Sequence, residues 1–273
     1  MTQTTTTTDL RSHFGMTEMP FTREIAVEDR WNSPHLDEAC ADLYKVVDGR
    51  QSAALISPAG GGKTTVLRAL RHQLPEARYR VHYVKVTSLS KRDMTREIAL
   101  AAGVTPAGSF PGLFRRLQER FETTQVEDGI RPVLILDEAH DLRPDVLGMV
   151  RLITNFDMDS RLVLSVILAG QPPLLAMLRR DDLESVSRRL THCATLRLLS
   201  RGETRKYMEH RVRVAGAREF PFDEPAIDAV YEVTRGNLRA IDTLGRKTLE
   251  IAAQEGHPTI SPATIAAARQ KLV

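Results

Sequence analysis

The sequence predicts an α/β domain, in which a parallel sheet lies between helices, followed by a small all-helical domain. Short apolar runs between residues 53 and 199 alternate with stretches whose apolar residues recur every three or four positions. This alternation is typical of parallel strands joined by amphipathic helices. Beyond Leu199 the strand pattern stops, and only helical stretches with Gly or Pro end signals follow. We therefore expect a domain boundary near residue 200.

The expected elements follow from these patterns in chain order. The apolar runs of strand length are residues 53–57, 80–86, 132–137, 161–170 and 193–199. Amphipathic helices are expected at 63–74 and 112–124, and beyond the boundary at 201–216, 223–236, 237–256 and 261–272. The predicted parts are a disordered tail at 1–12, a core domain at 13–200 and a helical domain at 201–273.

The N-terminal residues form two segments of different composition. The run from Thr4 to Thr8 is polar and of low complexity, so it cannot bury enough apolar surface to fold. Residues 13–25 mix aromatic residues with Gly and Pro. This mixture predicts a segment that packs onto a core without regular structure.

Composition excludes several classes of protein. No apolar run reaches about 18 residues, and no basic start precedes an apolar one, so neither a membrane span nor a secretory signal is expected. The two cysteines, Cys40 and Cys193, lack metal-ligand spacing, which predicts reduced thiols in a cytoplasmic protein. The net charge is +3, so any affinity for nucleic acid would depend on local basic patches.

The stretch ISPAGGGKTT, residues 56–65, predicts a phosphate-binding loop, the Walker A motif or P-loop. Glycines let backbone amides converge on phosphates, Lys63 reaches the outer phosphates, and the Thr64 hydroxyl ligates Mg²⁺. Ser57 stands where the pattern has its first glycine; a serine can still start the turn, so weaker or unaltered ATP binding is expected. The predicted nucleotide-binding residues of the loop are Ser57, Gly60, Gly61, Gly62, Lys63, Thr64 and Thr65.

A second motif, PVLILDEAH, places two carboxylates at the end of an apolar strand. Asp137 is predicted to hold Mg²⁺, and Glu138 to polarise the attacking water. Such a pair alone is more often a strand-end cap, but after a phosphate loop it indicates ATP hydrolysis. Helicases with the tetrapeptide DEAH need two sheet domains, for which the chain has no room. His140 and His192 have no metal-ligand partners at useful spacing and are interpreted as structural or surface residues.

The order of these motifs resembles an AAA+ ATPase, which has a P-loop NTPase core followed by a helical lid. More narrowly, it is similar to the branch containing the ExeA-type secretion ATPases and the transposition ATPases TnsC, TniB and MuB. The resemblance covers about residues 12 to 270. It rests on HFGMTEMPFTREI, SPAGGGKTT, LILDEAHDL, ILAGQPPLLAML, SRRL and GNLRAIDTL.

The resemblance implies further site residues. Gln171 ends the fourth strand and would sense the γ-phosphate. Arg188 or Arg189, with Arg189 the closer match, would reach into a neighbouring subunit's site. Arg239 would touch the nucleotide from the lid, although Leu238 replaces the usual proline. Alternatively, Arg188 and Arg189 are solvated helix residues, and Arg239 pairs with Glu232 or Asp242.

Three functions remain open. The preferred one is a regulator that forms a ring or filament on duplex DNA and recruits a transposase, with no membrane partner. The alternatives are a secretion-assembly ATPase, for which a membrane segment would be expected after the ATPase, and a nucleotide-dependent switch that binds only protein. Residues 201–218 carry a local excess of four positive charges, six basic against two acidic. The DNA-contacting candidates are Lys91, Arg92, Arg96, Arg205 and Lys206, unless these are simply solvated helix faces.

Overall fold

The computed structural model describes residues 9–272, which form two compact units. The α/β unit comprises residues 33–58 and 62–196. The helical unit comprises the described N-terminal residues up to Asn32, the short segment Ala59–Gly61, and the chain from Arg197 onward. Among the described residues, no helix is both long and apolar enough to cross a lipid bilayer.

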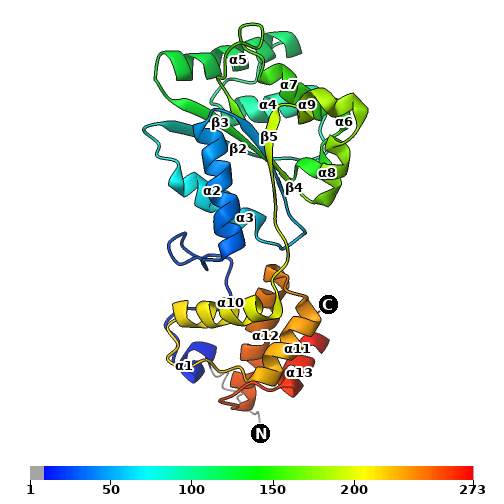
Figure 1. The fold of residues 1–273 in the computed structure, drawn as a ribbon. Coiled ribbons are helices and arrows are strands. Elements are labelled where there is room, and N and C mark those ends of the chain that lie inside the picture. The colour runs from blue at the N-terminus through cyan, green and yellow to red at the C-terminus, as the bar shows by residue number, and fades with distance from the viewer. Residues whose placement is uncertain (1–8, 273) are drawn as a thin grey trace. The chain divides into compact units, whose positions relative to one another are not determined.

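A five-stranded parallel sheet is the centre of the α/β unit (Figure 1). Its strands lie in the order β2-β3-β4-β1-β5. Their bounds are β1 Ser52–Ile56, β2 Tyr79–Lys85, β3 Arg131–Asp137, β4 Ser165–Gly170 and β5 Leu190–Thr195. The registers Lys85↔Asp137 and Ile56↔Gly170 bring the carboxyl ends of four strands to one edge. The predicted parallel α/β sheet is confirmed, although β4 is shorter than the apolar run at 161–170.

Helices cover both faces of this sheet, as its uninterrupted apolar strands require. Leu134 and Leu136 of β3 pack with the cluster under α4 to α9, whereas Val133 and Ile135 pack with the cluster under α2 and α3. This alternation is the two-residue period of a strand. The helices are α2 Pro34–Asp48, α3 Lys63–Gln73, α4 Lys91–Ala101, α5 Phe110–Val126, α6 Pro144–Leu147, α7 Met149–Ile153, α8 Pro172–Leu178 and α9 Glu184–Ser187.

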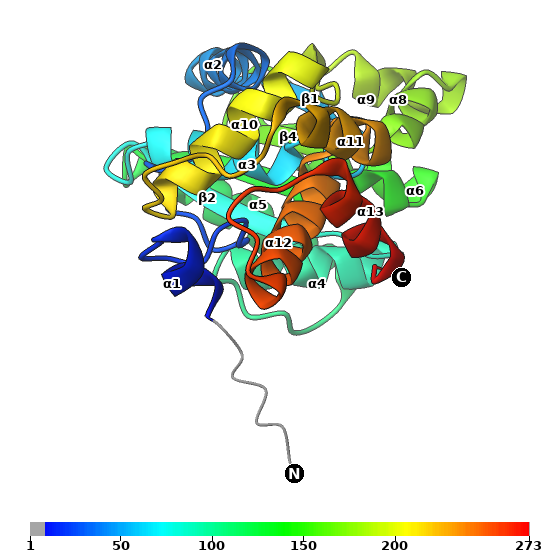
Figure 2. The ribbon, with the colours of Figure 1, turned by 90° about the horizontal axis from the view of Figure 1, so that it is seen from below.

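The helical unit buries a second core, and Figure 2 shows the helices that form this unit. Its helices are α1 Leu10–Phe14, α10 Arg201–Val214, α11 Glu224–Thr234, α12 Leu238–Glu255 and α13 Pro262–Gln270. Ser200 caps α10 with Glu203 in a capping box, so the predicted helix start there is well defined.

The N-terminal segment belongs to this helical core. Leu10, Met16 and Phe21 are buried in it, so part of the segment predicted as core-domain chain packs instead with residues beyond 197. Gly245 permits this packing, because a Cβ there would lie 3.1 Å from the Phe21 ring. Residues 10–12, at the end of the predicted disordered tail, form the start of α1, and residues 1–8 lie outside the described part.

A buried charged network ties the N-terminal segment to α10 and α12. Tyr207 donates a 2.7 Å hydrogen bond to Asp242, Arg211 Nη1 lies 3.9 Å from Asp242 Oδ2, and Arg211 also donates to the Thr22 carbonyl. Burial raises the pKa of Asp242 to about 6, although Arg211 and the Tyr207 hydrogen bond oppose that rise. The carboxyl therefore binds its proton more tightly in the folded protein than in the unfolded chain.

This raised pKa predicts a pH-dependent stability. The stabilising contribution of protonated Asp242 is fully present below its unfolded pKa of 3.8 and is lost as pH rises through about 6. Between pH 5 and 7.5 we expect the wild type to lose about 1.4 kcal/mol more unfolding free energy than Asp242→Asn does. Urea unfolding followed by Trp31, the sole tryptophan, reports this unit because Trp31 packs edge-on against Tyr207.

Glu219→Gln, which removes an exposed carboxylate of the same unit, is the matched control. It should follow the wild type at both pH values. If the unfolding free energies of the wild type and Asp242→Asn change by the same amount between the two pH values, the raised pKa of Asp242 is contradicted.

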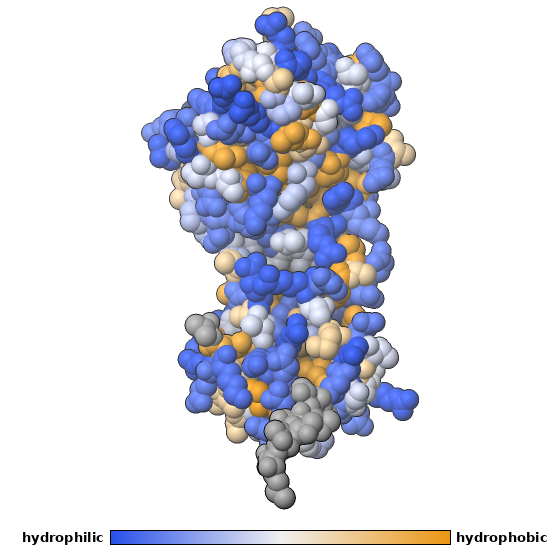
Figure 3. Space-filling model, turned by 180° about the vertical axis from the view of Figure 1, so that it is seen from behind, coloured by the Kyte–Doolittle hydropathy of each residue, from blue (hydrophilic) through white to orange (hydrophobic). Residues whose placement is uncertain are grey.

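The surface of the α/β unit is mixed. Seen from behind, it shows apolar areas between hydrophilic ones (Figure 3). Its exposed large apolar side chains include Leu152, Met158 and Leu162, of which Met158 is 94% exposed. Met158 lies in the turn that follows α7, directly before Asp159.

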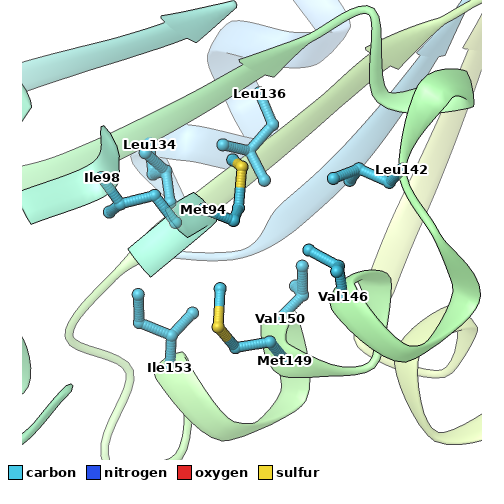
Figure 4. Close-up of a pocket in the computed structure, with 9 residues that line it drawn as sticks. All are labelled: Met94, Ile98, Leu134, Leu136, Leu142, Val146, Met149, Val150 and Ile153. Carbon is cyan, nitrogen blue, oxygen red and sulfur yellow. The ribbon is translucent and has the colours of Figure 1, made fainter. Parts of the chain in front are cut away.

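One small internal cavity lies beneath the sheet, between β3, α4 and the α6–α7 segment (Figure 4). Its volume is about 10 Å³, and side chains such as Met94, Leu136 and Met149 line it. A cavity of this size approaches the volume that one water needs, but an apolar lining offers no hydrogen-bond partners. The cavity is therefore a packing defect and not a ligand pocket.

Candidate nucleotide site

The phosphate loop joins β1 to α3. Gly60 and Gly62 have φ values of 72° and 101°, which L side chains rarely adopt. Ser57 is fully buried and is not among the residues with positive φ. Its N–H donates to the Gly170 carbonyl at 2.9 Å, and its hydroxyl donates to the Pro58 carbonyl at 3.0 Å. The serine therefore fits the start of the loop without needing a glycine conformation.

Lys63, at the end of the loop, forms ion pairs with the two carboxylates at the end of β3. It is the first residue of α3, is 9% exposed, and its ammonium contacts Asp137 Oδ1 and lies 2.8 Å from Glu138 Oε1. Asp137 is only 4% exposed. The structure thus brings together three residues predicted from motifs 74 positions apart in the chain. A cation and two carboxylates gathered at a helix N-terminus suit the binding of phosphate with a metal ion.

Tyr83 contacts Asp137, which the sequence analysis did not predict. It lies on β2, beside β3, and its hydroxyl donates a 2.9 Å hydrogen bond to Asp137 Oδ2. Burial, and then the hydrogen bond to Asp137, raise the pKa of this tyrosine. Asp137 Oδ1 also accepts the Glu138 N–H at 2.8 Å, so both carboxylate oxygens are held in place. Only the order of the strands reveals this contact, and the sequence does not give that order.

Glu138 lies at a sharp turn directly after β3. Its φ of 59° is left-handed, which is uncommon for a residue with a side chain and costs about 1 kcal/mol or more. The turn continues as a short 3₁₀ segment, Ala139–Asp141, which places His140 beside Glu138. His140 Nδ1 lies 3.5 Å from Glu138 Oε2, and its Nε2 lies 2.8 Å from the Gln171 side-chain nitrogen. The histidine interpreted as structural therefore contacts two predicted catalytic residues.

The residues at this edge fit Mg²⁺ with a nucleoside triphosphate. Mg²⁺ prefers oxygen ligands and is commonly held by one or two carboxylates, a hydroxyl and substrate phosphates. Asp137 and the exposed Thr64 hydroxyl at the start of α3 would supply the protein ligands. Within residues 9–272 no group of three His, Cys, Asp or Glu residues is arranged to hold a metal by itself. These two protein ligands suit a metal ion that binds together with the phosphates of the nucleotide.

Arg189, predicted to act on a neighbouring subunit, is held within its own subunit. Its two terminal nitrogens lie 2.6 and 2.7 Å from the two oxygens of Asp159, and its side chain is 21% exposed. This bidentate pair lowers the pKa of Asp159. Residues 157–159 all have positive φ, so a strained turn presents the carboxylate. Arg188, in contrast, is exposed and pairs with Glu184 at 2.7 Å.

Arg239 is exposed near the start of α12 in the helical unit. The two carboxylates considered as partners of Arg239 contact other residues. Glu232 pairs with Arg235 at 2.8 Å, and Asp242 accepts a hydrogen bond from Tyr207. The role of Arg239 at the nucleotide stays a prediction.

The predicted DNA-contacting residues fall into two groups. Lys91, Arg92 and Arg96 lie on the first turns of α4; Lys91 is 4.0 Å from Asp145, and Arg96 is 3.7 Å from Asp93. On α10, Arg205 is bound more closely, to Glu209 at 2.7 Å and also to Glu224, while Lys206 is exposed. Acidic neighbours therefore neutralise Arg205 of the α10 group.

Comparison with known proteins agrees with this geometry. A family model described as "AAA domain" matches residues 47–178. General secretion pathway protein A of Aeromonas hydrophila is 31% identical over 246 residues, which are 89% of this chain but 45% of that protein. The chain thus spans less than half the length of this relative.

Solved structures share the fold. Cdc6p of Pyrobaculum aerophilum superimposes with a TM-score of 0.73 at 18% identity, over 93% of this chain and 70% of that one. The ORC1 protein of Aeropyrum pernix, solved in complex with DNA, gives a TM-score of 0.71 at 19% identity, over 94% of this chain and 70% of that one. Four of the five strands, β1 to β4, the phosphate loop and the acidic strand end lie within the region of the AAA match. Residues 47–178 therefore match an AAA domain, and the chain has a P-loop NTPase fold of the AAA+ type and is similar to general secretion pathway protein A.

Proposed function

We propose that the protein is a Mg²⁺-dependent ATPase whose turnover depends on self-assembly and drives the assembly of a secretion apparatus. The observation that carries the ATPase proposal is the contact of the Lys63 ammonium with both Asp137 and Glu138. In this reaction Lys63 and the loop amides bind the phosphates, Thr64 and Asp137 hold Mg²⁺, and Glu138 orients the attacking water. Bound Mg²⁺ would supply the positive charge that offsets the charge developing on the phosphates.

The secretion role is preferred because it has better support than DNA transposition. The support is the 31% identity to general secretion pathway protein A over most of this chain. None of the relatives described above is a transposition protein. In the native host, deleting the gene should therefore reduce the amount of protein exported to the medium. The wild-type gene should restore export, and the gene with Glu138→Gln should not.

Dependence on assembly is proposed from Arg189, which would leave its pair with Asp159 on assembly so that its guanidinium neutralises charge at a neighbour's phosphates. We expect Arg189→Ala to lower turnover by about tenfold or more and to leave ATP affinity within about twofold of wild type. Arg188→Ala tests the other candidate: it removes an exposed arginine that pairs with Glu184 at 2.7 Å, and it should retain turnover if Arg189 is the residue that acts on the neighbour.

Mixing two inactive variants tests this directly. A Glu138→Gln subunit keeps Arg189, and an Arg189→Ala subunit keeps Glu138, so their mixture should hydrolyse ATP faster than either alone. Absence of this complementation, with assembly of the mixture shown by light scattering, would mean that Arg189 serves its own subunit.

Assembly on duplex DNA is a second candidate function, favoured by the exposed basic residues at the start of α4. A random-sequence duplex should then bind in the presence of ATP with an affinity that falls steeply as salt rises. Charge reversal at Lys91 and Arg92 should weaken binding and flatten the salt slope, while reversal at Arg205 and Lys206 should do less, since Arg205 is already paired. Fluorescence anisotropy without binding at low salt and micromolar protein would exclude this candidate.

A further inference from the structure

We propose that two groups at the start of α12, the Asn237 side chain and the Leu238 backbone N–H, hold the phosphate loop in the conformation that binds phosphate. The inference rests on the proposed ATPase function and adds two positioning residues to its nucleotide site. Asn237 Nδ2 donates a 2.6 Å hydrogen bond to the Ala59 carbonyl. The Leu238 N–H donates a 3.0 Å hydrogen bond to the Gly60 carbonyl. All four residues belong to the helical unit, which includes the segment Ala59–Gly61 of the loop.

The start of α12 presents both donors to the loop. Asn237 is the N-cap of the helix, and its Oδ1 accepts the Ala240 N–H at 3.1 Å, so its NH₂ group is left to donate elsewhere. Leu238 is the first residue of the helix, where a backbone N–H has no partner within the helix. Gly60 permits the close approach, because a Cβ there would collide with the Asn237 side chain. A proline, which the motif usually has at position 238, would have no N–H to donate.

The two bonded carbonyls fix the direction of two N–H groups of the loop. A trans peptide group is planar, so its C=O and its N–H point in opposite directions. The two bonds therefore direct the N–H groups of Gly60 and Gly61 away from the start of α12. Gly60 and Gly62 have positive φ, and Gly61 between them does not. This alternation is typical of a nest, in which successive backbone N–H groups converge on an anion.

A loop rich in glycine needs such an anchor. Glycine adopts positive and negative φ about equally readily, so the peptide groups beside glycines turn over at little cost. A turned peptide group would face the phosphate with its carbonyl oxygen, which repels an anion, instead of its N–H. Because the carbonyls of Ala59 and Gly60 are bonded to the start of α12, turning either peptide group also breaks a hydrogen bond. The two donors thereby raise the fraction of molecules whose loop is ready to bind, and with it the apparent affinity for ATP.

Leu238→Pro removes the backbone donor without disturbing the start of the helix. Proline is well accepted at the first helical position, and the extended backbone of Asn237, with φ −74° and ψ 114°, is the conformation that precedes a proline. Affinity for a non-hydrolysable ATP analogue, measured by calorimetric titration, should fall by about threefold to tenfold, the usual contribution of one hydrogen bond. Leu238→Ala is the matched control, because it truncates the same buried side chain and keeps the N–H. Its affinity for the analogue should stay close to that of wild type.

Asn237→Ser removes the side-chain donor and keeps the helix cap. Serine caps helices about as well as asparagine but has no amide NH₂ to reach the Ala59 carbonyl. The expected loss of affinity is again about threefold to tenfold, and the double variant with Leu238→Pro should lose about tenfold or more. Asp223→Ser is the control, because it places serine at the N-cap of α11, where Asp223 accepts the Ala226 N–H at 2.6 Å. This control should bind the analogue as the wild type does.

Linkage provides a second readout, which a purely structural role would not change. If the two bonds favour the loop that binds ATP, bound ATP must favour the two bonds to the same extent. The saturating analogue with Mg²⁺ should therefore raise the urea midpoint for unfolding of the helical unit, followed by the fluorescence of Trp31. In the double variant, saturated to the same degree, this rise should be smaller. Arg239 is retained in every variant, so a contact of that residue with the nucleotide does not account for the difference.

Two results would overturn the inference directly. Equal losses of affinity in Leu238→Ala and Leu238→Pro would assign the effect to the side chain and not to the N–H. An equal rise of the urea midpoint in the double variant and the wild type would show that the two bonds do not couple to the nucleotide. If wild-type protein binds the analogue and all variants match it, the inference fails while the ATPase proposal stands. If wild-type protein binds neither ATP nor the analogue, the ATPase proposal fails and the inference fails with it.

Discussion

Glu138→Gln is expected to bind ATP with nearly wild-type affinity and to hydrolyse it at least about a hundredfold more slowly, as expected for the loss of a general base. Glutamine has nearly the same shape as glutamate, so it can still lie beside the Lys63 ammonium. In the wild type, Glu138 Oε1 lies 2.8 Å from this ammonium. An amide cannot accept a proton from water or orient it as a carboxylate does. Binding and turnover should therefore separate in this variant.

Single-turnover hydrolysis and equilibrium nucleotide binding measure the two properties independently. Glu119→Gln, which removes an exposed carboxylate on α5, is the control and should leave both unchanged. Turnover at the wild-type rate in Glu138→Gln would show that another group activates the water. Because the backbone at Glu138 is left-handed in either case, the substitution should not change the strain of the turn.

The motifs predicted from the sequence are those whose residues are close neighbours in the chain. The phosphate loop and the two carboxylates are each set by a strand followed at once by a turn, so local patterns are sufficient to locate them. The parallel sheet follows in the same way from apolar runs of strand length between amphipathic helices, and the order β2-β3-β4-β1-β5 then brings Lys63 to Asp137.

Contacts between segments that lie far apart in the chain could not be predicted from the sequence. Tyr83 meets Asp137 only because β2 lies next to β3, and His140 meets Gln171 only because β3 lies next to β4. Asp159 was missed because a strained turn, not a regular element, brings it to Arg189. The N-terminal segment was predicted to pack onto a core, but composition cannot say which core, and Phe21 fills a space above Gly245 in the helical unit.

Lys63→Ala is expected to weaken ATP binding by about a hundredfold or more, since hydrogen bonds to charged groups each contribute about 1.5 to 3 kcal/mol. It should also destabilise the protein without nucleotide. Asp137 is 4% exposed, and removing the ammonium beside it leaves a buried carboxylate without its cation. Breaking a buried ion pair from one side typically costs about 3 to 5 kcal/mol. Loss of ATP binding could therefore reflect partial unfolding of the loop rather than loss of a phosphate contact.

A double variant separates these two causes. Lys63→Ala with Asp137→Asn removes both charges, and the asparagine can still accept the Tyr83 hydrogen bond, so stability should recover by about 2 kcal/mol or more relative to Lys63→Ala. ATP binding should stay as weak as in the single variant, because neither the phosphate cation nor the metal ligand is restored. Thermal unfolding followed by circular dichroism measures the first quantity, and nucleotide titration measures the second. Recovery of ATP binding together with stability would show that Lys63 acts chiefly on the fold and not on the phosphate.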